Sequence, residues 1–252
     1  MSTPTSASMP QLVIPAAVSP FGPQLSRLPD ELILQIFKQV AVSMFPVNSR
    51  FKTVIDPKIF AILNRHYAIN RIRNVSTGFS IFFMQAFYEN YTFSFKHCQL
   101  YNYWSVYLTS LPAPLPRLHF RHHLRSMRIE IVLENYFFAA QEIFVLRTTT
   151  SFYRTRCKIT TAAQLLMHCP AARQLHGLTD PWIGFSNLAL LELHIRADFQ
   201  YYPIDDEFLG ALEDANLVVT AGKVKLTVTD GYGNIKPEHL EVKKRIVVDG
   251  AL

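Results

Sequence analysis

Three segments in the second half of the chain alternate apolar and polar residues, and this alternation constrains the fold more than any other feature. Successive side chains of a β-strand point to opposite faces of a sheet, so each segment is predicted to be a strand with one buried face. The segments span residues 127–133, 191–195 and 224–228. Their spacing leaves room for helices between them, which favours a parallel or mixed sheet with helices packed on it.

Helical patterns fall between these strands, and a last strand is predicted near the end of the chain. The helical segments are 139–146, 161–168 and 206–214, and the last strand is 244–248. The expected fold class is α+β or α/β, with a mixed strand–helix domain over residues 96–252. The strand spacing is too irregular for a strict solenoid, so a degenerate leucine-rich array is the repeat architecture to consider.

The first 95 residues have a different character. Residues 1–24 are rich in Pro, Ser, Thr and Ala, which is typical of a disordered leader. Residues 25–95 are predicted to be mainly helical, with runs at 28–40, 58–75 and 80–89.

The run at 28–40 has an apolar stripe wide enough to serve two surfaces. Pro29 suits the start of a helix, and the two acids that follow it suit the positive end of the helix dipole. The apolar residues form two adjacent ridges: Leu32, Ile36 and Val40 on one, and Ile33 and Phe37 on the other. If one ridge packs inward, the other can bind a partner helix or groove. The alternative from periodicity alone is an ordinary amphipathic helix whose apolar face is fully buried.

Composition also favours a surface that a partner covers. Charged residues make up only 17% of the 252 residues and aromatic residues 13%, whereas about 25% charged is usual. A chain so poor in charge is expected to leave apolar surface exposed, which is typical of an interaction site. Three widely spaced cysteines, and no apolar run long enough to span a bilayer, favour an intracellular protein of the cytoplasm or nucleus.

The sequence Leu-Pro-Asp-Glu-Leu-Ile-Leu-Gln-Ile-Phe at 28–37 resembles the opening of an F-box, the module that binds the Skp-type subunit of cullin-based ubiquitin ligases. The matching residues are Leu28, Pro29, Glu31, Leu32, Ile36 and Phe37. The segments at 70–73 and 87–93 are also similar to those of a fungal group of F-box-like proteins. The second half of the motif diverges, because residues 41–74 lack the usual Asp-Leu pair and Trp.

The resemblance implies a non-catalytic adaptor in the ubiquitin conjugation pathway. Its helical region would bind the Skp-type subunit, and the strand–helix domain would present a target protein. The expected partner-binding residues are Leu28, Pro29, Glu31, Leu32, Ile33, Ile36 and Phe37. No cofactor, metal or membrane contact is expected.

No motif identifies a reaction, so an enzyme is not expected. His119, His122 and His123 are close together, but no cysteine or carboxylate lies near them in sequence to complete a metal site. Cys98 and Cys169 each follow a histidine, but residues adjacent in sequence point their side chains apart. No phosphate-binding glycine loop is present.

Two other functions stay open. The first is a stand-alone globular protein with a degenerate F-box and no ligase role. The second, less favoured, is a nucleic-acid-binding protein, suggested by the net charge of +6 and by basic residues with aromatic neighbours. Those basic residues are Arg117, Arg121, Arg125, Arg128, Arg154, Arg156 and Lys158.

Overall fold

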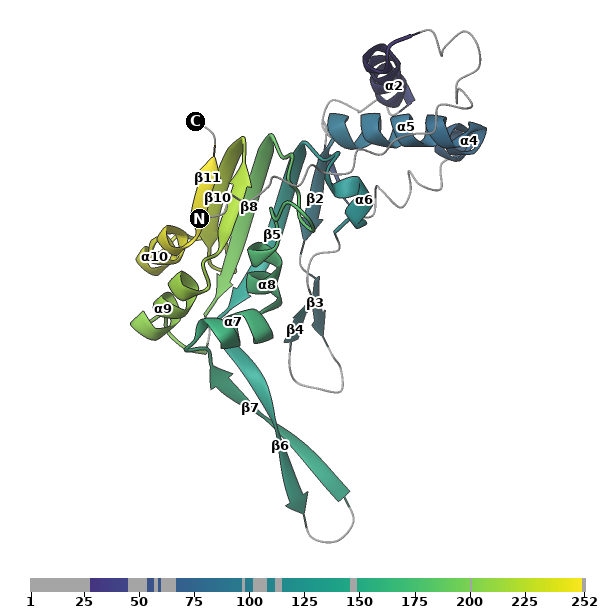
Figure 1. The fold of residues 1–252 in the computed structure, drawn as a ribbon. Coiled ribbons are helices and arrows are strands. Elements are labelled where there is room, and N and C mark those ends of the chain that lie inside the picture. The colour runs from purple at the N-terminus through teal and green to yellow at the C-terminus, as the bar shows by residue number, and fades with distance from the viewer. Residues whose placement is uncertain are drawn as a thin grey trace, which may run out of the picture.

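A five-stranded parallel sheet lies at the centre of the molecule (Figure 1). The computed structural model describes residues 28–44, 54–56, 59, 67–96, 98–101, 108–111, 115–145, 149–199 and 201–250. The predicted leader at 1–24 lies outside these residues. The strands of the sheet, in their order across it, are β1 (Val54–Ile55), β2 (Thr92–Lys96), β5 (Ser126–Glu134), β8 (Leu190–Asp198) and β10 (Lys223–Thr229).

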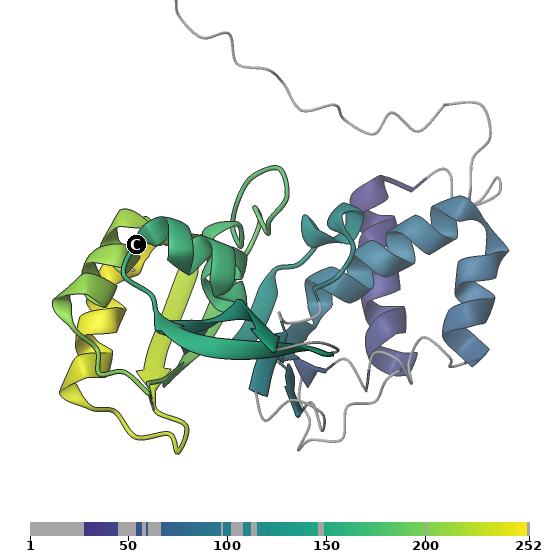
Figure 2. The same ribbon diagram turned by 90° about the horizontal axis from the view of Figure 1, so that it is seen from below.

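Helices lie at both ends of the sheet. The first group is α2 (Asp30–Met44), α4 (Tyr67–Val75) and α5 (Thr77–Asn90), beside β2. The second group is α9 (Asp206–Asp214) and α10 (Pro237–Arg245), at the β10 end. Seen from below, the strands separate these two groups (Figure 2). Two further short helices, α7 (Ala162–His168) and α8 (Pro170–His176), lie between β5 and β8 in the chain, and α8 packs on β5.

The sheet has one apolar and one polar face, as the alternation predicts. Neighbouring strands are in register, so the buried side chains form continuous rows across the sheet. The apolar rows contain Phe93, Met127 and Leu191; Phe95, Ile129 and Leu193; and Ile131, Ile195 and Val228. Burying a side chain of this size stabilises the fold by about 1.5–3 kcal/mol, so these rows are the main source of stability in the sheet.

Most of the predicted elements are confirmed, and the exceptions have physical reasons. The segments at 127–133, 191–195 and 224–228 are strands, and α7 and α9 lie where helices are predicted. The helix predicted at 139–146 is wrong, because these residues belong to strand β6 (Tyr136–Val145), which pairs with β7 (Thr149–Lys158). A short apolar run fits either structure, and the antiparallel pairing partner decides between them.

The predicted strand at 244–248 is wrong at its start. Helix α10 continues to Arg245, and the strand β11 begins at Val247 and pairs in parallel with β9 (Val218–Ala221). The region 25–95 is also less helical than predicted, because it supplies β1 and β2. The domain boundary predicted at residue 96 therefore falls at the end of strand β2. Strands from both sides of this boundary belong to the same sheet.

The strand order follows the chain order, which is the order that stacked strand–helix units produce. The connections, however, do not repeat one unit. Between β2 and β5 lie a small hairpin and a short helix: β3 (Cys98–Tyr101), β4 (Leu108–Leu111) and α6 (Leu118–Arg121). Between β5 and β8 lie the long β6–β7 hairpin, which projects from the body (Figure 1), and two helices. The described residues thus form a mixed α/β fold around a parallel sheet.

An aromatic cluster joins the N-terminal helices to the sheet. The Phe83 and Phe87 rings of α5 lie 6.3 Å apart between centroids, and the Phe87 ring lies 5.7 Å from that of Phe93 in β2. Tyr88 stacks on Phe93 at 4.9 Å and on Phe120 at 5.1 Å. The segment at 87–93 that contributes to the F-box resemblance is therefore the junction between α5 and β2.

Candidate docking surface on helix α2

Helix α2 begins just after Pro29, as the sequence indicates. The Pro29 carbonyl accepts hydrogen bonds from the backbone N–H groups of Leu32 and Ile33, at 3.0 and 3.1 Å. Asp30 and Glu31 lie in the first turn, where the helix dipole favours negative charge. The sequence therefore fixes both the start of the helix and the rotation of its faces.

One face of α2 is part of the protein's own core. Ile33, Phe37 and Ala41 are buried, and the Phe37 ring contacts those of Phe79 and Phe83 at 5.3 and 6.3 Å between centroids. Ile33 and Phe37 are among the expected partner-binding residues, but in this structure they anchor α2 to α5.

The neighbouring ridge of α2 stays exposed. Leu32 is 46% exposed and Ile36 45% exposed, although both are large aliphatic residues on a helix that packs well on its other side. We call these two residues the α2 ridge. Pro29 and Glu31 are exposed beside it, and Leu28 is half-buried against the core. Of the seven predicted partner-binding residues, the structure thus leaves four exposed, one half-buried and two buried.

Polar contacts fix α2 on α5. Lys38 forms an ion pair of 2.8 Å with Glu89, and the Tyr91 hydroxyl donates a hydrogen bond of 3.1 Å to the carbonyl of Ala41. Partial burial would raise the pKa of Glu89, but hydrogen bonds from Lys38 and Gln85 hold this pKa below its usual value. The helix that carries the α2 ridge is therefore held at both its middle and its end, which lowers the entropic cost of binding.

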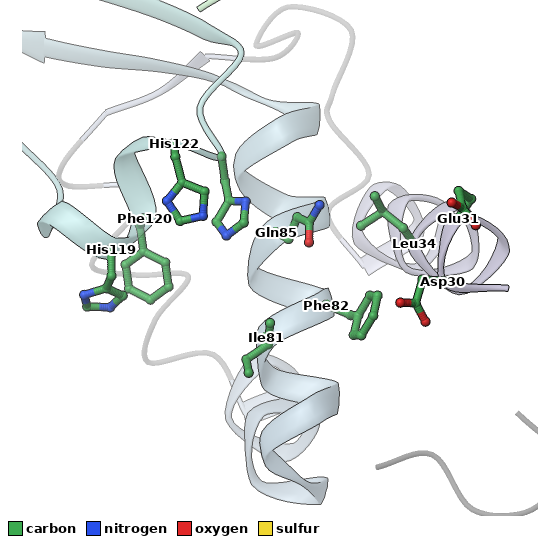
Figure 3. A pocket seen from close by; sticks show the side chains of 10 residues that line it. Asp30, Glu31, Leu34, Ile81, Phe82, Gln85, His119, Phe120 and His122 are labelled. Atoms are coloured by element: carbon green, nitrogen blue, oxygen red, sulfur yellow. The ribbon is translucent and has the colours of Figure 1, made fainter. Parts of the chain in front are cut away.

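A pocket of about 620 Å³ opens between α2, α5 and α6 (Figure 3). Its floor is mainly apolar, and carboxylates from α2 and imidazoles from α6 and the following turn form opposite walls. Its lining includes Asp30, Glu31, Leu34, Phe82, His119 and His122. The histidine cluster thus faces α2, and no group of three or more potential metal ligands occurs among the described residues.

The histidines make stability depend on pH. Partial burial, reinforced by His122, lowers the pKa of His123 from 6.5 to about 4. Between these values the unfolded chain binds a proton here that the folded protein does not, so the free energy of unfolding falls as pH decreases through this range. We expect urea denaturation from pH 7 to about pH 4.5 to show this loss, and a His123→Gln variant to show a shallower one. Equal pH dependence of the two proteins would contradict this assignment.

Most of the basic residues considered for nucleic-acid binding make contacts within the chain. Arg121 donates to the carbonyls of Pro116 and Ile183, and Arg125 donates to that of Asn187. Lys158 pairs with Asp205 and Glu207. Arg156 lies 3.3 Å from the centroid of the Tyr201 ring, with two further rings nearby. These cations serve local structure, and the side chain of Arg154 lies outside the described residues.

The His168–Cys169 pair does not form a nucleophilic site. Cys169 is fully buried, and burial raises the pKa of its thiol. His168 stacks on Phe137, at 4.1 Å between ring centroids, instead of turning toward the thiol. His97 and the side chain of Cys98 lie outside the described residues.

No protein-family model, curated protein or solved structure matches the chain. Within the part of the chain that the structure describes, no helix is long and apolar enough to cross a membrane. The α2 ridge and the contacts that support it are therefore the features of this molecule that bear on its function.

Proposed function

We propose that this protein is a non-catalytic, F-box-like adaptor that docks on the Skp-type subunit of a cullin-based ubiquitin ligase through helix α2. The observation that carries the proposal is the exposure of Leu32 and Ile36, at 46% and 45%, on a helix whose adjacent face is buried. Adaptors of this kind act in the cytoplasm or nucleus.

The α2 ridge has the properties of an interface centre. Large apolar side chains contribute most to binding when a partner removes them from water, at about 1.5–3 kcal/mol for each one fully buried. Exposed Glu31 lies beside the ridge and contributes to a polar rim, which keeps water away from such a centre. A stand-alone protein with no partner would gain stability by burying these side chains or replacing them by polar ones.

The proposed mechanism is tethering. The N-terminal helices hold the chain on the ligase, and the α/β sheet presents a target protein to the ubiquitin-transfer machinery. Attachment raises the effective concentration of the target near the transfer site without any reaction in this chain. The aromatic contacts between α5 and β2 support these two separate roles. Because α2 packs on α5, these contacts couple the docking helix rigidly to the sheet.

The simplest test is complex formation between the purified full-length chain and a purified Skp-type subunit. We expect one complex with one copy of each protein in size-exclusion chromatography with light scattering. We expect a dissociation constant of about 1 μM or tighter, which corresponds to about −8 kcal/mol, so loading at tens of micromolar keeps the complex intact. Separate elution of the two proteins at that concentration would contradict the proposal and favour a stand-alone protein.

A further inference from the structure

The polar face of the parallel sheet carries a cation on each of four neighbouring strands. The alternation that buries the apolar rows places Lys96 of β2, Arg128 of β5, Arg196 of β8 and Lys225 of β10 on the opposite face. Lys223 adds a fifth cation at the start of β10. These five residues define what we call the cationic sheet face.

Two glutamates lie among these cations, and each bridges two of them. Glu192 pairs with Arg128 at 2.6 Å and with Lys225 at 2.8 Å. Glu130 pairs with Lys96 at 2.9 Å and with Arg196 at 3.6 Å. Along the stretch of the face between Lys223 and Arg196, two carboxylates thus face five cations, and the positive charge is only partly neutralised. Glu134 follows at the end of β5, beyond that stretch.

The carboxylates on this face are less exposed to solvent than the cations. The side chains of Lys96, Arg128 and Lys225 are 67%, 49% and 55% exposed. Those of Glu130 and Glu192 are 21% and 22% exposed. An approaching molecule therefore meets ammonium and guanidinium groups first, while the glutamates beneath hold them in place.

We infer that the cationic sheet face binds an acidic, Asp- and Glu-rich segment of a target protein, lying extended across strands β2, β5, β8 and β10. Charge complementarity selects this occupant, because the exposed groups are donors to carboxylates and Arg can bind a carboxylate through two parallel hydrogen bonds. The hydroxyls of Thr92, Ser126 and Thr227 on the same face supply further polar contacts.

The dimensions of the face fit a short peptide. Neighbouring strands lie about 4.8 Å apart, so the four strands span about 14 Å. An extended chain advances about 3.3 Å per residue, so about five residues cross the face. A carboxylate on alternate residues repeats about every 6.6 Å, so about three carboxylates fall within the width of the four strands.

The role of this face in target recognition rests on the proposed function, but the binding itself is measured without the Skp-type subunit. The probe is a fluorescein-labelled peptide of about ten residues, rich in Asp and Glu, titrated with the full-length chain in a fluorescence anisotropy assay. We expect saturable binding that weakens as salt increases, because exposed charges are screened. We expect the Arg128→Gln plus Lys225→Gln variant to bind about tenfold more weakly.

The matched control removes the same charge elsewhere. Lys243→Gln plus Lys244→Gln removes two cations from α10, away from the sheet face, and is expected to change the affinity less than about twofold. Equal loss in both variants would overturn the inference, because the binding would then follow net charge alone. So would tighter binding of a single-stranded oligonucleotide at the same face, and so would no peptide binding. None of these results affects the chromatographic test of the Skp-type complex.

Discussion

Replacing Phe37 by alanine is expected to lower the free energy of unfolding by about 3–5 kcal/mol, the usual cost of removing a buried phenylalanine. Phe37 is buried between α2 and α5, and its ring contacts Phe79 and Phe83 edge to face. The cavity left behind cannot close without moving α2, whose position is also set by the Lys38–Glu89 ion pair. Urea denaturation of the full-length chain, followed by circular dichroism, measures the loss.

Leu32→Ala is the matched control for this prediction. It removes a large apolar side chain from the same helix, but one that is 46% exposed, so we expect a loss below about 1.5 kcal/mol. Equal losses for Phe37→Ala and Leu32→Ala would show that α2 does not pack on α5 as described. The pair of variants thus separates the residues that support the helix from those that it presents.

The variant Leu32→Asp plus Ile36→Asp is expected to weaken binding of the Skp-type subunit by at least about a hundredfold. Each side chain is nearly half exposed, so losing the two apolar contacts costs about 1.5–3 kcal/mol, and each 1.4 kcal/mol is a factor of ten in affinity. Burying a carboxylate in an apolar interface adds to this cost. Isothermal titration calorimetry with the wild-type and variant chains measures the change.

The fold is expected to survive this double substitution. Both side chains are nearly half exposed, so aspartate at either position keeps access to water. Thermal unfolding should therefore change little, which shows that lost binding is not lost folding. Unchanged affinity in a folded double variant would place the interface elsewhere on the molecule.

The sequence predicts strands best where one face of a strand is buried and the other is polar. Segments such as Leu191–Ile195 alternate because the sheet has a core side and a charged side, and this pattern can be recognised in one segment without knowing which strands lie next to it. The pairing register between strands cannot be predicted from a single segment. Only the structure places Glu192 between Arg128 and Lys225, residues separated by 64 and 33 positions from it.

Sequence reasoning fails where tertiary contacts decide. Residues 139–146 fit a helix, but pairing with β7 makes them a strand. Helix α10 is missed because its exposed face is long and charged, and only a few of its residues, such as His239 and Val242, are buried. In α2 the sequence defines two apolar ridges, but only the position of α5 decides that Phe37 is buried and that Ile36 is exposed.

Site-specific photo-crosslinking from α2, in the complex with the Skp-type subunit, tests directly whether the α2 ridge is the docking surface. Ile36→benzoylphenylalanine places a photoreactive group on the α2 ridge, and Val42→benzoylphenylalanine places the same group on another exposed part of the same helix. We predict that the group at position 36 crosslinks to the Skp-type subunit and that the group at position 42 does so far less. Crosslinking from position 42 alone, or from neither position in a sample where the complex is present, would contradict it.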